Sequence, residues 1–139
     1  MRNIEIEVDG IVAKAVFLHE KAPRTCAKVW ELLPIEDRTI QVRWSGAAWR
    51  TEKNYPLNLG EIENPVTVLE AGDIIYYDDP RYGLYKIGLA YGRAAWRDFA
   101  GDLPVAHIGR ITDNLEPLMK VGERVIFEGP KLVRIRRTE

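Results

Sequence analysis

The side chains most able to do chemistry in this sequence are an arginine, a histidine and the single serine. Arg43 stands between Val42 and Trp44, so if Val42 faces a core, Arg43 faces the other side of its strand. A guanidinium presents a planar set of donors that suits a carboxylate or a polarised carbonyl oxygen. On spacing alone, a solvent-exposed surface charge is the simpler interpretation of Arg43.

His107 and Ser45 each have two interpretations. His107 lies in an apolar, strand-like run, and a histidine can act as a general acid or base, although a hydrogen-bonded core histidine is commoner. Ser45 lacks the glycine two residues earlier that a nucleophile elbow uses, so a turn residue is the better interpretation. His19 and His107 are far apart and have no metal-site spacing, so we expect no metal and no other cofactor.

Aromatic residues crowd the middle of the chain: Trp44, Trp49, Tyr76, Tyr77, Tyr82, Tyr85, Tyr91 and Trp96. Most should be core residues or cross-strand pairs. A pocket lined by a few aromatic rings and one arginine is also a common way to bind a small organic acid or amide. The candidate catalytic residues are therefore Arg43 and His107, and the candidate ligand-binding residues are Trp44, Ser45, Trp49, Tyr76 and Tyr91. Residues 93–102 form a candidate lid.

Size and composition restrict the class of protein. The 139 residues predict one domain spanning residues 1–139, and the net charge of −1 favours neither nucleic acid nor an anionic membrane as a partner. No apolar run is long enough to span a bilayer. The one cysteine, Cys26, excludes an internal disulfide and fits a reducing compartment. With no signal-peptide pattern at the N-terminus, we expect a cytoplasmic protein of bacterial style.

The pattern of elements predicts a mainly β fold. Residues 4–8 alternate, Asp9-Gly10 is a hairpin turn, and residues 11–18 return as a second strand. Residues Pro23–Leu33 form an amphipathic helix that Pro34 ends. Short strands with turns between them fill most of the remainder, with a bulge at Gly88 and a short helical turn near Trp96.

A second helix is expected over residues 112–122, with Thr112 and Asp113 as capping residues and Gly122 as its end. Two helices this far apart among many short strands favour a closed β-barrel. Each helix would cover one open end of the barrel with its apolar face.

Several motifs resemble a known family. The segment "FLHEKAPRTCAKVWELLP" is similar to the strand, loop and first helix of cyclophilins, and "HIGRITDNLEPLMKVGERV" is similar to their second-helix region. The whole chain more closely resembles a family of small uncharacterised bacterial cyclophilin-like proteins, in the helix at residues 22–34, the "RWSG" turn at residues 43–46 and the "AGDI" turn at residues 71–74. The resemblance implies an all-β, closed, antiparallel eight-stranded barrel with two capping helices.

The resemblance also implies a role for one residue. Cyclophilins carry a catalytic arginine on the strand after the first helix, and Arg43 is the nearest match by position. The glutamine, paired glycines and phenylalanine-rich segment of the peptide groove have no counterpart after Arg43. Three functions therefore stay open: a small-molecule site for an amide- or carboxylate-bearing metabolite, with or without catalysis; a prolyl isomerase with a reduced groove; or a non-catalytic binding protein. We expect a homo-oligomer.

Overall fold

A closed barrel of eight antiparallel strands forms the centre of the molecule. The computed structural model describes residues 2–99 and 101–138. Around the barrel the strand order is β2-β1-β12-β3-β4-β8-β7-β11, and pairing of β11 with β2 closes it. The eight strands are β1 (Asn3–Val8), β2 (Ile11–Phe17), β3 (Ile35–Gln41), β4 (Gly46–Thr51), β7 (Asp73–Asp79), β8 (Leu84–Ala95), β11 (Val105–Asp113) and β12 (Leu132–Arg137). The expected eight-stranded barrel is confirmed.

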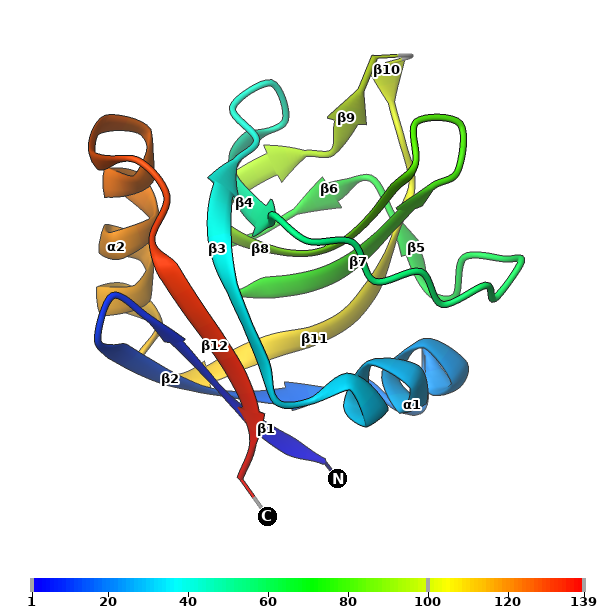
Figure 1. Cartoon of the computed structure of the whole chain (residues 1–139), viewed down its shortest axis with the longest axis horizontal. Coiled ribbons are helices and arrows are strands. Elements are labelled where there is room, and N and C mark those ends of the chain that lie inside the picture. Colours follow the sequence, from blue (N-terminus) through cyan, green and yellow to red (C-terminus); the bar gives the residue numbers. More distant parts are fainter. Residues whose placement is uncertain (1, 100, 139) are drawn as a thin grey trace.

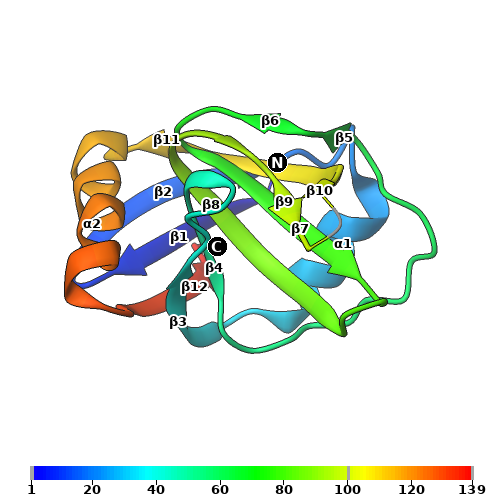
Figure 2. The ribbon, with the colours of Figure 1, turned by 90° about the horizontal axis from the view of Figure 1, so that it is seen from above.

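Two helices lie at opposite ends of this barrel (Figures 1 and 2). Helix α1 (Pro23–Leu32) and helix α2 (Leu115–Glu128) both contribute apolar side chains to the barrel core. On α1, the thiol of Cys26 donates to the carbonyl oxygen of Ile108 at 3.3 Å, and burial raises the thiol pKa to about 12. Cys26 is therefore a packing residue, as its place on the apolar face predicted.

The predicted boundaries of α2 were wrong at both ends. Thr112 and Asp113 belong to β11, and Asn114 in a left-handed conformation precedes the helix. Gly122 lies inside α2. A Cβ at this position would stand 2.4 Å from the Tyr91 ring carbon Cγ, so the position has room only for glycine. The glycine is thus required by close packing against β8, and it does not end the helix.

Short elements outside the barrel cover one part of its surface. They are β5 (Pro65–Val66), β6 (Val68–Leu69), β9 (Arg97–Asp98) and β10 (Gly101–Asp102). Strands β9 and β10 pair with each other, and β6 pairs with the end of β8. The expected helical turn near Trp96 is absent from the described residues, where β8 instead runs on to Ala95.

The covered strands carry apolar side chains on both faces. On β7, Ile74 and Tyr76 point into the barrel, whereas Ile75 and Tyr77 point outward, and all four are buried. The outer layer, which we call the outer core, consists of Val42, Ala48, Leu69, Ile75, Tyr77, Ala90, Ala94, Trp96 and Val105. This second apolar layer forms the wall beside which the candidate site lies.

Candidate functional site

A cavity of about 630 Å³ opens on the outer core, outside the barrel. Its apolar lining comes from Val42, Trp44, Tyr77, Leu84, Trp96 and Phe99, and its polar lining from Arg50, Arg97, Asp98 and Gly101. The volume lies within the range of about 300–1,000 Å³ that is usual for small-molecule sites. A cavity of this kind, aromatic with a few charges, matches the chemistry that the sequence predicted.

The β-sheet register places the cavity residues on one face. Side chains alternate along a strand, so Arg50 on β4 points outward because its neighbours Trp49 and Thr51 point inward. Arg50 pairs with Gly88 on β8, and Gly88 pairs with Ile75 on β7. Tyr77 lies two residues further along β7, on the same outer face.

The indole of Trp96 forms the floor of the cavity by packing on Gly88. A Cβ on Gly88 would lie 2.8 Å from Cη2 of Trp96, so only glycine allows the ring this close. Trp96 is only 1% exposed and makes a tilted ring contact with Tyr77, with ring centroids 5.7 Å apart. Gly88 is therefore explained by close ring packing, and the bulge expected there was wrong, because the register shift between β4 and β8 falls between Gly46 and Ala48.

Arg50 is the half-buried cation of the cavity. Its Nη1 donates to the carbonyl oxygen of Thr51 at 2.9 Å. Burial lowers the pKa of Arg50, while Tyr77, Asp37 and Glu52 act in the opposite direction. Arg50 forms no ion pair with any carboxylate in residues 2–99 or 101–138. A partly desolvated guanidinium with no direct carboxylate contact favours the approach of an anion.

The acidic side of the cavity is tied to a neighbouring arginine. The guanidinium of Arg81 lies 3.0 Å from Asp79 and 3.0 Å from Asp98, and both carboxylates are almost completely buried. The Tyr77 hydroxyl donates to the same two carboxylates at 3.4 Å. Hydrogen bonds from Arg81 lower the pKa of Asp79 to about 2. This network fixes Asp98 at the cavity edge and offsets its charge.

Of the "RWSG" residues, the structure places Trp44 at the cavity and Ser45 behind it. The indole nitrogen of Trp44 donates to the carbonyl oxygen of Arg97 at 3.1 Å, and the ring is 57% exposed. The backbone N–H of Arg97 donates to the Ser45 hydroxyl at 2.9 Å. Ser45 therefore joins the turn to β9. This agrees with its interpretation as a turn residue. Arg43 is exposed in that turn and is not among the residues that line the cavity.

The other aromatic candidates lie inside the barrel. Trp49, Tyr76 and Tyr91 are all buried in the barrel core. The hydroxyl of Tyr76 donates to the carbonyl oxygen of Tyr55 at 2.7 Å, and that of Tyr91 donates to Oε1 of Gln41 at 2.8 Å. The structure thus does not bring these three rings together with Trp44 around the outer cavity.

His107 lies apart from the cavity, on β11. Its Nε2 is 3.1 Å from Oδ1 of Asp73, and both side chains are about one-fifth exposed. The backbone N–H of His107 donates to Asn64, and the Asn64 amide donates back to the His107 carbonyl oxygen. These contacts attach the segment before β5 to the barrel, and they place His107 away from Arg50.

Sequence reasoning missed Arg50 and Trp96 as partners in one site. Both lie in strands that the sequence did predict, and the alternation around Arg50 gave the signal: Ala48 and Arg50 share a face opposite Trp49. Trp96 comes close to Arg50 only because β8 and the segment after it fold back over Gly88. That tertiary contact has no pattern within a short window of sequence.

Among the described residues no group of three or more His, Cys, Asp and Glu side chains could hold a metal ion. Within the same part of the chain, neither helix has the length and apolar character needed to cross a bilayer.

Comparison with solved structures identifies neighbours at the level of fold. One is similar over 97% of this chain, with a TM-score of 0.70 and 20% identity, and is described as McbB in complex with tryptophan. This chain spans only 44% of the McbB chain. Another, the hypothetical protein AF2241 from Archaeoglobus fulgidus, has a TM-score of 0.64 and 22% identity, with coverage of 99% of this chain and 95% of AF2241.

A search of curated proteins finds no match to this chain. The family comparison is positive: the model described as "Protein of unknown function (DUF3830)" matches residues 4–136, which include every strand of the barrel except the ends of β1 and β12. The chain therefore belongs to the DUF3830 family.

Proposed function

We propose that the outer cavity binds a small planar molecule that carries a carboxylate, with Arg50 pairing with the carboxylate and aromatic rings enclosing the planar part. The observation that carries this proposal is the half-buried guanidinium of Arg50, which lines an aromatic cavity and has no carboxylate partner among the described residues. The proposal concerns binding and includes no chemical step.

The charges around Arg50 support an anionic ligand. Asp98 is paired with Arg81, and Arg97 is paired with Asp102 at 2.8 Å. Arg50 is thus the cation of the cavity lining that has no direct ion pair with a carboxylate among the described residues, although Asp37 and Glu52 act on it from further away. A carboxylate that enters the cavity would form a charge-assisted, bidentate pair in a partly desolvated place, where such pairs are strongest.

The aromatic walls support a planar ligand. Trp96 and Tyr77 supply a buried floor, while Trp44 and the 84% exposed ring of Phe99 supply the accessible rim. Offset stacking between rings contributes about 0.5–1.5 kcal/mol beyond buried area. McbB, whose fold is similar, was solved with tryptophan, so aromatic amino acids and indole acids are reasonable first ligands to test here.

Isothermal titration with indole-3-acetate and with indole-3-acetamide tests the proposal. The acid should bind more tightly than the amide, and Arg50→Gln should weaken binding of the acid by about 10-fold or more, as expected for loss of one charge-assisted pair. The amide should be affected much less.

Arg43→Gln is the matched control, because it removes the same charge from the exposed turn two residues beyond β3. We expect its affinity to stay within about twofold of the unchanged protein, as surface charges usually contribute little. Equal losses in Arg43→Gln and Arg50→Gln, or equal binding of acid and amide, would contradict the proposed site.

A further inference from the structure

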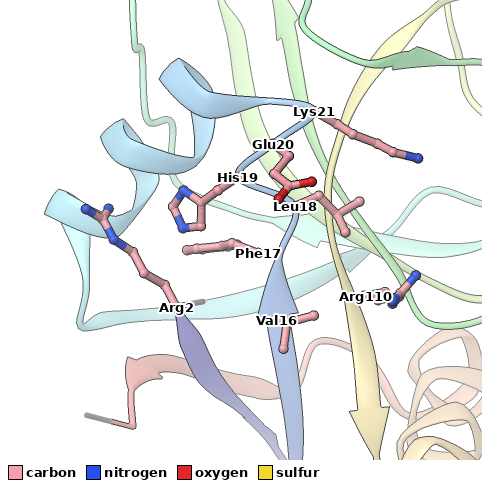
Figure 3. Close-up of a pocket in the computed structure, with 8 residues that line it drawn as sticks. All are labelled: Arg2, Val16, Phe17, Leu18, His19, Glu20, Lys21 and Arg110. Carbon is pink, nitrogen blue, oxygen red and sulfur yellow. The ribbon is translucent and has the colours of Figure 1, made fainter.

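A second cavity of about 570 Å³ lies at the end of β2, and it shares no lining residue with the outer cavity. Its floor is apolar and comes from Val16, Phe17 and Leu18. Its charged lining comes from the segment before β1, the loop after β2, and β11. Figure 3 shows how these side chains surround the strand end.

The charges of this second cavity are unbalanced. Arg2, Lys21 and Arg110 contribute three positive charges and Glu20 one negative charge, so the lining carries a net charge of +2. None of these four side chains forms an ion pair with a residue that the structure describes. Elsewhere in the same residues most arginines do pair with carboxylates, namely Arg24, Arg38, Arg81, Arg97, Arg124, Arg134 and Arg136.

One side of the cavity is formed by Arg2 and His19. The guanidinium of Arg2 lies over the ring of Trp30, 5.1 Å from its centroid, which fixes its plane. His19 packs edge-on against Phe17, with ring centroids 6.0 Å apart. The Nε2 atom of His19 is buried and has no hydrogen-bond partner within residues 2–99 and 101–138. An anionic oxygen beside Arg2 would also accept a hydrogen bond from His19 in the tautomer that is protonated at Nε2.

The other side holds the remaining cations. Figure 3 shows Arg2 and His19 on one side of the strand end, and Lys21 and Arg110 on the other, with Leu18 and Val16 near the latter pair. Arg110 pairs with Val16 in the β11–β2 register, which fixes its place on the sheet. The two positive groups thus lie on opposite sides of the apolar residues at the strand end.

We propose that this second cavity binds a small, elongated molecule that carries an anionic group, carboxylate or phosphate, at each end. One end pairs with Arg2 and His19, and the other pairs with Arg110 and Lys21. The apolar middle of the ligand lies on Val16, Phe17 and Leu18. The proposal is independent of the proposed function of the outer cavity, because the two linings are separate.

A chain-length series tests this arrangement. Isothermal titration would use the unbranched dicarboxylates from glutarate to azelate, each compared with the monocarboxylate of equal carbon number. One length should bind at least about 10-fold more tightly than its monocarboxylate, since each charge-assisted pair contributes about that much. The terminal bisphosphates of the corresponding diols show which anionic group is preferred, and either preference supports the proposal.

Three variants test whether the dicarboxylate binds in this second cavity. Arg2→Gln and Arg110→Gln should each reduce the best dicarboxylate to the affinity of the monocarboxylate, while Arg93→Gln, an exposed arginine of β8 outside both cavities, should leave it unchanged. Arg110 is exposed, so we expect its variant to stay folded even if loss of Arg2 disturbs the packing on Trp30, and a thermal melt of each variant checks this.

Several outcomes would overturn the proposal. They are affinity that does not depend on chain length, equal binding of mono- and dicarboxylates, or an equal loss of binding in Arg93→Gln. Arg50→Gln separates the two sites: it should leave dicarboxylate binding intact, and a loss in this variant would assign the dicarboxylate to the outer cavity instead.

Discussion

The two apolar layers of this protein share four strands, β4, β7, β8 and β11, and yet differ in how they are filled. Inside the barrel, Trp49 and Tyr76 pack with both helices around them, and the Tyr76 hydroxyl is bonded to the backbone. Outside the same wall, Trp96 packs on Gly88, and a cavity of about 630 Å³ stays open beside Arg50. The inner layer closes the fold, and the outer layer leaves room for a ligand.

This difference follows from what covers each face. The inner layer is enclosed on all sides by the barrel wall and by two amphipathic helices. The outer layer is covered by short segments, among them β5, β6, β9, β10 and the turn that contains Trp44. Short segments bury less area than a helix does, so they leave space between them. A binding site outside the barrel is therefore compatible with a well-packed interior.

The largest expected effect is the contrast between two tryptophans. Trp49→Ala should lower the free energy of unfolding by about 5 kcal/mol, and Trp96→Ala by about 3 kcal/mol, the two ends of the range for such truncations. The smaller value applies to Trp96 because its space adjoins an open cavity that water can enter. Urea unfolding of both variants measures the two free energies of unfolding. A destabilisation by Trp96→Ala equal to or larger than that by Trp49→Ala would contradict the expected difference between the layers.

A glycine substitution tests how tightly the helix closes the inner layer. Gly122→Ala should destabilise by about 1–3 kcal/mol through overpacking against Tyr91, although alanine normally favours a helix by about 1 kcal/mol. Lys120→Ala, on the exposed side of α2, is the control and should be nearly neutral. Stabilisation by Gly122→Ala in a urea titration would show that the inner layer has room for an added methyl group beside Tyr91.

The carboxylate network at the outer layer predicts a pH dependence. The pKa of Asp79 in the folded protein, about 2, lies below its usual value. This group therefore stabilises the fold at pH values above its usual pKa. That contribution should be lost as the pH falls from about 4 to about 2. Asp79→Asn should flatten this part of the curve of unfolding free energy against pH. An unchanged slope in the variant would mean that Arg81 does not hold Asp79 ionised.

The smallest expected effect on stability comes from the proposed ligand-binding residue. Arg50→Met replaces a half-buried charge by an apolar side chain of similar length, so the free energy of unfolding should change little or rise by up to about 1 kcal/mol. Binding of indole-3-acetate should be lost in the same variant. A large loss of stability in chemical unfolding would instead identify Arg50 as a structural residue of the outer layer.

Much of the barrel could be predicted from local patterns. Alternation in residues 4–8, the Asp9-Gly10 turn and the apolar stripe from Pro23 each act within a few residues, and the structure contains all three elements. The end of the second helix could not be placed, because Gly122 is explained by Tyr91, which is distant in sequence. Turn propensity and close packing both select glycine, and one sequence does not distinguish them.

The candidate site was predictable in kind more than in residues. An arginine with aromatic walls was expected, and the structure has one, but the cavity's half-buried guanidinium belongs to Arg50, whereas Arg43 lies in the exposed turn. Position relative to the first helix favoured Arg43. The burial of Arg50 depends on how Trp96 and β9 fold over β4 and β8, and no short-range pattern reports that contact.

The place of β12 in the barrel has a consequence for biosynthesis. This strand lies between β1 and β3, so residues from the far end of the chain join two of the earliest strands. Until the ribosome has released residues 132–137, both neighbours have an unpaired edge that can recruit other chains. Nascent or truncated forms should therefore depend on chaperones until β12 pairs with β1 and β3.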